Sequence, residues 1–228
     1  PRYTSEDLLA FYMITGGVAK YIEQLVVRKA FTKDKILNTV LAEGSYFLEE
    51  GKDVLIEEFG RDYTNYFSVL SLIASSKTSR GDIESTLNMP VGGYLDKLEN
   101  EYNLIRRTRP FMAKEGSRNN KYKIEDNFLR FWFRFVYKYR SAVEIGNLDY
   151  VREIVERDYE TFSGSVLEKY FRVCLAESKE YSDVQGYWDR KGENEIDIVA
   201  VNDFEKRMLI GEVKRNETRI NLHILENK

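Results

Sequence analysis

The chain has 228 residues, of which 43% are hydrophobic and 32% charged, and its formal net charge is −3. This is a globular composition with room for more than one small domain. Cys174 is the single cysteine and His223 the single histidine, which argues against a disulfide scaffold, a cysteine-based zinc site and Ser-His-Asp or Cys-His catalysis. Any catalysis is therefore expected to use carboxylates, lysine and a hard cation.

Residues 1 to about 62 are expected to be helical. Val18, Tyr21, Ile22 and Leu25 recur at helical spacing after a Gly-Gly pair. Composition alone indicates a small helical bundle with a solvated acidic face. Because the chain begins with Pro1 rather than Met, we interpret it as a fragment of a longer protein.

Residues 63 to about 125 are expected to form three helices followed by two strands. Ser79 is the expected N-cap of the second helix, and Pro90 suits the first turn of the third. Turn residues separate strands expected at 104–108 and 120–124. This order is typical of a winged helix-turn-helix, whose third helix normally enters the major groove of DNA and whose hairpin contacts the backbone.

The expected hairpin lies in a locally basic stretch. Between Leu104 and Arg140 there are eleven Lys or Arg and three acids, so this stretch carries +8 and the rest of the chain −11. The expected third helix is acidic, with Asp96, Glu99 and Glu101, and is poorly suited to phosphates. We therefore expect nucleic acid, DNA in particular, to contact the hairpin; the alternative is a protein-binding spacer with a solvated hairpin. The hairpin candidates are Arg106, Arg107, Arg109, Lys121 and Lys123.

Residues 126–145 predict an aromatic-rich helix interrupted by Arg130 and Arg134. Aromatic side chains interleaved with arginines are one pattern that stacks on bases. The preferred interpretation is a buried core. The two arginines also prevent this stretch from spanning a membrane, and no signal-peptide pattern is visible, so we expect a cytoplasmic protein with no membrane partner.

The last part of the chain predicts a helix near 164–176 and strands near 184–189, 195–201 and 207–215. Glu212 and Lys214 alternate onto one face of the third strand. If Asp197 on the second strand faces the same way, and Glu168 approaches from the helix, the four side chains converge. Such a group can hold Mg²⁺ and activate water for phosphodiester hydrolysis, with Asp197 and Glu212 as metal ligands. Glu195 is a weaker candidate, and the alternative is a surface salt bridge.

The whole chain resembles the C-terminal portion of archaeal-type P-loop ATPases of the AAA+/STAND-like kind. The resemblance rests on the Gly16-Gly17 stretch, with Ala19 where the family usually has Pro, on the segment from Pro90 to Arg107, and on the aromatic and acidic motifs of the last hundred residues. It implies an α+β protein with a helical lid-like segment (1–62), a winged helix-turn-helix (63–125) and a small α/β domain of PD-(D/E)XK nuclease-like type (126–228). It also implies catalytic roles for Glu168, Asp197, Glu212 and Lys214.

The sequence contains no G-x-x-x-x-G-K-[ST] loop, so ATP is expected only through an upstream ATPase domain of the same protein. Two functions follow from the resemblance. The first is a DNA-handling part of an ATPase with a winged helix and an Mg²⁺-dependent nuclease-like domain. The second is a non-catalytic regulatory or protein-interaction module coupled to that ATPase. A second copy of the chain is a further candidate partner, in a homo-oligomer.

Overall fold

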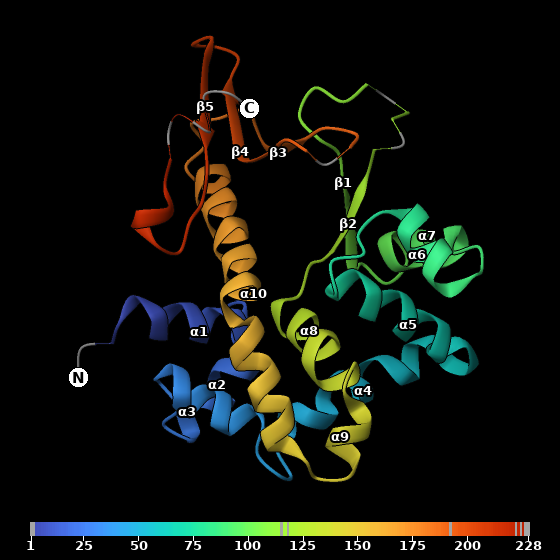
Figure 1. Ribbon diagram of the computed structural model, residues 1–228. Helices are drawn as coiled ribbons and strands as arrows, with labels where there is room; N and C mark the ends of the chain where they lie inside the picture. Colours follow the sequence, from blue (N-terminus) through green and yellow to red (C-terminus); the bar gives the residue numbers. More distant parts are fainter. Residues whose placement is uncertain are drawn as a thin grey trace. The chain divides into compact units, whose positions relative to one another are not determined.

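The computed structural model describes residues 3–114, 116–117, 119–191, 193–221, 223 and 225, apart from the side chains at 54 and 57 (Figure 1). Pro1 lies outside these residues, as do Glu115 and Arg118, two of the charged residues counted between Leu104 and Arg140. The chain divides into two compact units. Unit 1 comprises Pro1–Arg107 and Tyr122–Tyr159, and unit 2 comprises Thr108–Lys121 and Glu160–Lys228. These two units differ from the three domains expected from the sequence, whose boundaries lie after residues 62 and 125.

The first part of unit 1 is helical, as the sequence predicts. It contains α1 (Ser5–Thr15), α2 (Ala19–Val27), α3 (Lys33–Val40), α4 (Tyr46–Phe59) and the 3₁₀ turn η1 (Gly60–Asp62). Thr4 and Asp7 form a capping box at the start of α1, and Gly16 ends it with φ 54°. Phe59 stacks on Tyr66 with ring centroids 4.5 Å apart, so the helices before and after residue 62 share one core.

Three helices and a two-stranded sheet follow: α5 (Tyr63–Ala74), α6 (Arg80–Leu87), α7 (Gly92–Asn100), β1 (Ile105–Thr108) and β2 (Lys121–Ile124). The Ser79 hydroxyl accepts a hydrogen bond from the Asp82 amide at 3.1 Å, which confirms Ser79 as the N-cap of α6. The prediction that Pro90 lies in the first turn of the third helix is wrong, because α7 begins at Gly92 with Val91 as its N-cap and Pro90 precedes that cap. The element order is the expected one; the winged-helix assignment stays a prediction.

The aromatic-rich segment at 126–145 contributes to the core, which is the interpretation preferred from the sequence. It contains α8 (Asn127–Phe131), the π-helical turn η2 (Trp132–Tyr137) and α9 (Arg140–Glu144). Phe128, Phe131, Phe133 and Phe135 are each at most 1% exposed, which removes them from any base-stacking role in this fold. The Trp132 indole N–H donates to the Leu48 carbonyl at 2.8 Å, so the polar edge of this buried ring is satisfied.

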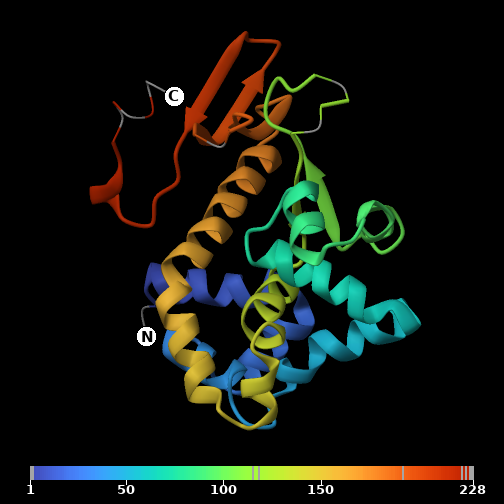
Figure 2. The ribbon, with the colours of Figure 1, turned by 45° about the vertical axis from the view of Figure 1, so that its right-hand side comes forward.

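Unit 2 contains a three-stranded antiparallel sheet in the order β3-β4-β5: β3 (Asp183–Trp188), β4 (Glu195–Asn202) and β5 (Arg207–Gly211) (Figure 2). The helix α10 (Leu148–Glu177) is much longer than the segment predicted from Gly164, and it runs from unit 1 into unit 2. Tyr170 and Phe171 of this helix are 44% and 43% exposed. Helices and small sheets together make an α+β protein, as expected. No helix in the described ranges has the length and apolarity required to cross a membrane.

Candidate carboxylate site in unit 2

Asp197 lies where the pairing of β4 and β5 ends. The last paired residues are Ile198 and Gly211, so Asp197 and Glu212 occupy the next opposed positions just beyond the ladder. The Asp197 Oδ2 atom accepts a hydrogen bond from the Val213 amide at 2.8 Å. The Asp197 carboxylate therefore holds the backbone of the segment that leaves β5.

Glu212 and Lys214 follow β5 rather than lying in it. The expectation of a strand through residue 215 is wrong, because the Val213 amide bonds to the Asp197 side chain instead of extending the ladder. The two side chains nevertheless meet, with 3.4 Å between Lys214 Nζ and Glu212 Oε2. The Glu212 side chain is 10% exposed and the Lys214 side chain 34%, so this pair is partly shielded from water.

Arg172 links the helix residue of the site to β4. Its Nη2 atom lies 3.2 Å from Glu168 Oε2, and its Nε–H donates to the Asp197 carbonyl at 2.9 Å. Sequence reasoning did not identify Arg172. The signal was present, because Glu168 and Arg172 are an i,i+4 pair of opposite charge on one helix face.

Within unit 2, Arg172 joins the Glu168 side chain to the main chain at Asp197, and the Asp197 side chain binds the main chain between Glu212 and Lys214. Each carboxylate already has a protein partner: Arg172 for Glu168, the Val213 amide for Asp197 and Lys214 for Glu212. Across the described ranges, no group of three or more His, Cys, Asp or Glu side chains is placed to hold a metal ion. Carboxylate oxygens, such as those of Asp197 and Glu212, are the ligand type that Mg²⁺ takes in proteins, usually one or two of them together with several waters.

In unit 1, the basic hairpin residues lie close to acids of the same unit. Arg106 Nε is 3.7 Å from Glu125, and Arg107 Nε is 3.6 Å from Glu99. Lys123 is on β2. The side chains of Arg106 and Arg107 are 69% and 39% exposed. Replacing these exposed ion pairs with contacts to phosphate would therefore cost little free energy.

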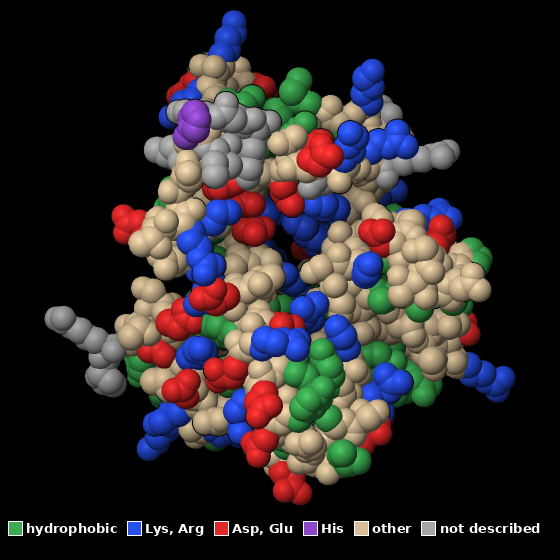
Figure 3. All heavy atoms as spheres, in the orientation of Figure 1, with side chains coloured by type: hydrophobic (Ala, Val, Ile, Leu, Met, Phe, Trp, Pro, Cys, Tyr) green, Lys and Arg blue, Asp and Glu red, His purple; other side chains and the backbone are tan. Residues whose placement is uncertain are grey.

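In unit 2, Lys121 contacts two side chains of the sheet. Its Nζ atom lies 2.8 Å from Glu195 Oε1 and 4.6 Å from the centre of the Trp188 ring. Glu195, the weaker site candidate, is therefore engaged by Lys121. Arg109 is exposed. Acidic and basic side chains are interspersed on the face drawn in Figure 3.

Comparisons with known proteins give a family match and a relative, both without an assigned function. Residues 132–224, which include the whole carboxylate site, match the family DUF234, described as archaeal and bacterial proteins of unknown function. The chain is also similar to an uncharacterized protein of Methanocaldococcus jannaschii, with 30% identity over 222 residues. That alignment covers 94% of this chain and 49% of the relative, so the chain spans about half the length of the curated relative it matches. No solved structure matches.

Proposed function

We propose that this chain is the nucleic-acid-handling part of a longer, ATPase-containing protein, and that unit 2 carries a metal-dependent phosphodiesterase site of the PD-(D/E)XK type. One observation carries the proposal: Arg172 holds Glu168 beside the main chain of Asp197, and the Asp197 carboxylate holds the Val213 amide between the paired side chains of Glu212 and Lys214. A helix carboxylate, a strand aspartate and a Glu-x-Lys segment are the parts that such a site requires. The ATPase part rests on the sequence resemblance, and the greater length of the relative leaves room for it.

Each residue has a role that its position supports. Asp197 and Glu212 are the pair that would hold Mg²⁺, and a bound Mg²⁺ supplies positive charge to the phosphate and lowers the pKa of a coordinated water. Lys214, beside Glu212, places an ammonium where it can orient the attacking water or stabilise charge developing on the phosphate. Glu168 completes the site from α10. The basic residues of β1 and β2 would contact the nucleic-acid backbone.

A second function is supported by a different observation. Arg172 and Lys214 already supply the positive charges that a metal ion would bring to Glu168 and Glu212. A site neutralised in this way is stable without a cation and need not catalyse anything. The chain would then be a non-catalytic module that regulates an upstream ATPase domain or binds another protein.

Cleavage and calorimetry separate the two functions. The 228-residue chain is incubated with DNA and, separately, RNA in Mg²⁺ or in EDTA, and Mg²⁺ binding is measured by calorimetry. The proposed nuclease cleaves in Mg²⁺ alone, and Asp197→Asn abolishes cleavage. Asp203→Asn is the matched control, because Asp203 is an exposed acid on the turn after β4. A folded chain that binds no Mg²⁺ and cleaves neither substrate would overturn the nuclease proposal and leave the non-catalytic module as the favoured function.

A further inference from the structure

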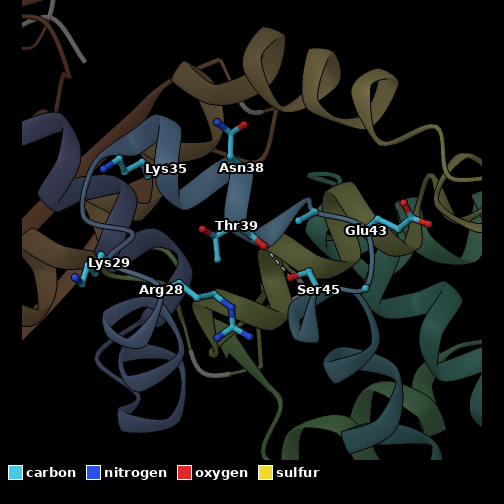
Figure 4. A pocket seen from close by; sticks show the side chains of 9 residues that line it. Arg28, Lys29, Lys35, Asn38, Thr39, Glu43 and Ser45 are labelled. Carbon is cyan, nitrogen blue, oxygen red and sulfur yellow. Dashed lines mark hydrogen bonds between the residues drawn. The ribbon is translucent and has the colours of Figure 1, made fainter.

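A pocket of about 480 Å³ opens in unit 1 among residues that follow α2, residues of α3 and the loop before α4 (Figure 4). Most of the lining residues have polar or charged side chains, while polar and apolar atoms share the lining surface about equally. No residue of the carboxylate site or of the β1–β2 hairpin contributes to it. The volume lies in the range of small-molecule sites, roughly 300–1,000 Å³.

The lining carries excess positive charge. Arg28, Lys29 and Lys35 contribute three cations, while Glu43 is the one acid among the lining residues. Figure 4 shows Glu43 on the opposite side of Thr39 from Lys29 and Lys35. No salt bridge joins any of the three cations to a carboxylate in the described part of the chain. An anion entering the pocket would therefore meet charges that the protein has not already neutralised.

The helix dipoles account for only part of this charge. Arg28 and Lys29 follow the last residue of α2, where the negative end of the dipole favours cations. Lys35 is the third residue of α3, where the positive end of the dipole disfavours a cation. Lys35 is exposed and gains no stabilisation from the helix dipole, so its charge is available to an anionic ligand between the two helices.

Two side chains on the pocket wall are held in place by hydrogen bonds. Arg28 Nη1 donates to Gln24 Oε1 at 2.6 Å and to the Gln24 carbonyl at 3.1 Å, and neither bond uses the Nε or Nη2 protons. Ser45 Oγ donates to the Thr39 carbonyl at 2.8 Å, the bond drawn in Figure 4. Ser45 is also the N-cap of the 14-residue α4, so a helix N-terminus, which favours anions, begins at the pocket edge.

From these observations we infer that the pocket binds a small ligand carrying two or more phosphate groups. A guanidinium fork and two ammonium groups match phosphate oxygens in charge and hydrogen-bonding capacity. Asn38 and Thr39 add neutral donors to the lining. The volume exceeds that of a single phosphate, which favours a diphosphate or longer group.

Calorimetry with inorganic pyrophosphate tests this assignment on the 228-residue chain. The wild type should bind pyrophosphate, and added salt should weaken binding because the contacts are charged. Lys35→Gln and Lys29→Gln should each lower the affinity about tenfold, the effect of losing one hydrogen bond to a charged group. Lys52→Gln is the matched control: Lys52 is an exposed lysine of α4 outside the pocket, and its substitution should leave the affinity unchanged.

Three results would overturn the inference. The first is no heat from millimolar pyrophosphate with the folded wild type, and the second is equal affinity in Lys35→Gln and the wild type. The third is displacement of bound pyrophosphate by a single-stranded oligonucleotide at lower concentration than by tripolyphosphate, which would assign the pocket to a nucleic-acid backbone. Because neither the probe nor the variants involve Mg²⁺ or Asp197, the outcome is independent of the proposed nuclease site.

Discussion

Gly51 of α4 lies directly against the indole of Trp132, so that a Cβ atom at residue 51 would be less than 3.0 Å from three of the ring carbons. The Trp132 N–H is bonded to the Leu48 carbonyl one turn earlier in α4, so moving the ring away from residue 51 would strain or break this bond. A glycine, usually unfavourable inside a helix, is therefore required here by packing.

We expect Gly51→Ala to destabilise the chain by about 1–3 kcal/mol, the usual cost of overpacking a core. Gly81→Ala is the matched control, because Gly81 is in α6 and an added Cβ would meet no atom within 4 Å. That change should stabilise by about 0.5–1 kcal/mol through better helix propensity. Urea unfolding of both variants measures the difference. Equal effects of the two changes would show that Trp132 does not exclude a side chain at residue 51.

Asp158 should make unit 1 sensitive to acid. Its hydrogen bonds with the Arg157 guanidinium hold its pKa below the ordinary value of 3.8; partial burial opposes this shift, and Arg134 adds to it. A carboxylate with a lowered pKa stabilises the fold fully above its unfolded pKa and loses that contribution as pH falls through its folded pKa.

Asp158→Asn should therefore cost about 1 kcal/mol at pH 7, and the difference from wild type should shrink as pH falls below 3.8 and through the lower pKa of the folded state. Denaturant unfolding as a function of pH provides the measurement. Asp149→Asn is the control, since the Asp149 side chain is 88% exposed and its removal should change stability by less than about 0.5 kcal/mol. A difference that persists undiminished at pH 3 would mean that the charge of Asp158 is not responsible.

Nucleic-acid binding, if it uses the hairpin, should depend on Arg107 and on Lys121. Arg107→Ala and, separately, Lys121→Ala should weaken binding to all sequences and reduce the salt dependence by about 0.9 log units per lost phosphate contact. Fluorescence anisotropy at several salt concentrations gives both quantities. Lys52→Ala, outside the hairpin, should bind as wild type does. Unchanged affinity in both hairpin variants would move the interface elsewhere or remove it.

Arg172 is expected to compete with a cation for the carboxylate site. Arg172→Gln should raise the Mg²⁺ affinity about two- to tenfold, because it removes a positive charge beside Glu168. It should also cost about 1–3 kcal/mol of stability, through loss of the bonds to Glu168 and to the Asp197 carbonyl. Calorimetry and thermal unfolding measure the two effects. Arg190→Gln is the control, because Arg190 is exposed and precedes β4. If Arg172→Gln lowers the Mg²⁺ affinity and Arg190→Gln does not, Arg172 does not compete with the cation and is a positioning residue.

Local sequence signals predicted most of the elements. Helical periodicity gave the helices of the first hundred residues, Ser79 gave the start of α6, and the aromatic density around Phe131 and Phe133 predicted a core. In each case the determining interactions lie within a few residues of one another or follow from hydrophobicity alone.

The features that the sequence did not predict depend on contacts between residues far apart in the chain. The end of β5 depends on a bond between Asp197 and the Val213 amide, and the glycine at residue 51 depends on Trp132. The pocket brings together Arg28, Lys35 and Ser45, whose separate segments show no shared pattern in the sequence. The role of Arg172 required knowing which carbonyl of β4 faces α10.

The bond between Asp197 and the Val213 amide means that one carboxyl group carries two separable properties. Its charge is what a metal ion would use, whereas its oxygen is what anchors the main chain beyond β5. Alanine at residue 197 removes both, so inactivity in that variant would not distinguish lost chemistry from a displaced Glu212 and Lys214. Asparagine keeps an acceptor oxygen and discards the charge, and the contrast between the two substitutions isolates electrostatics from architecture.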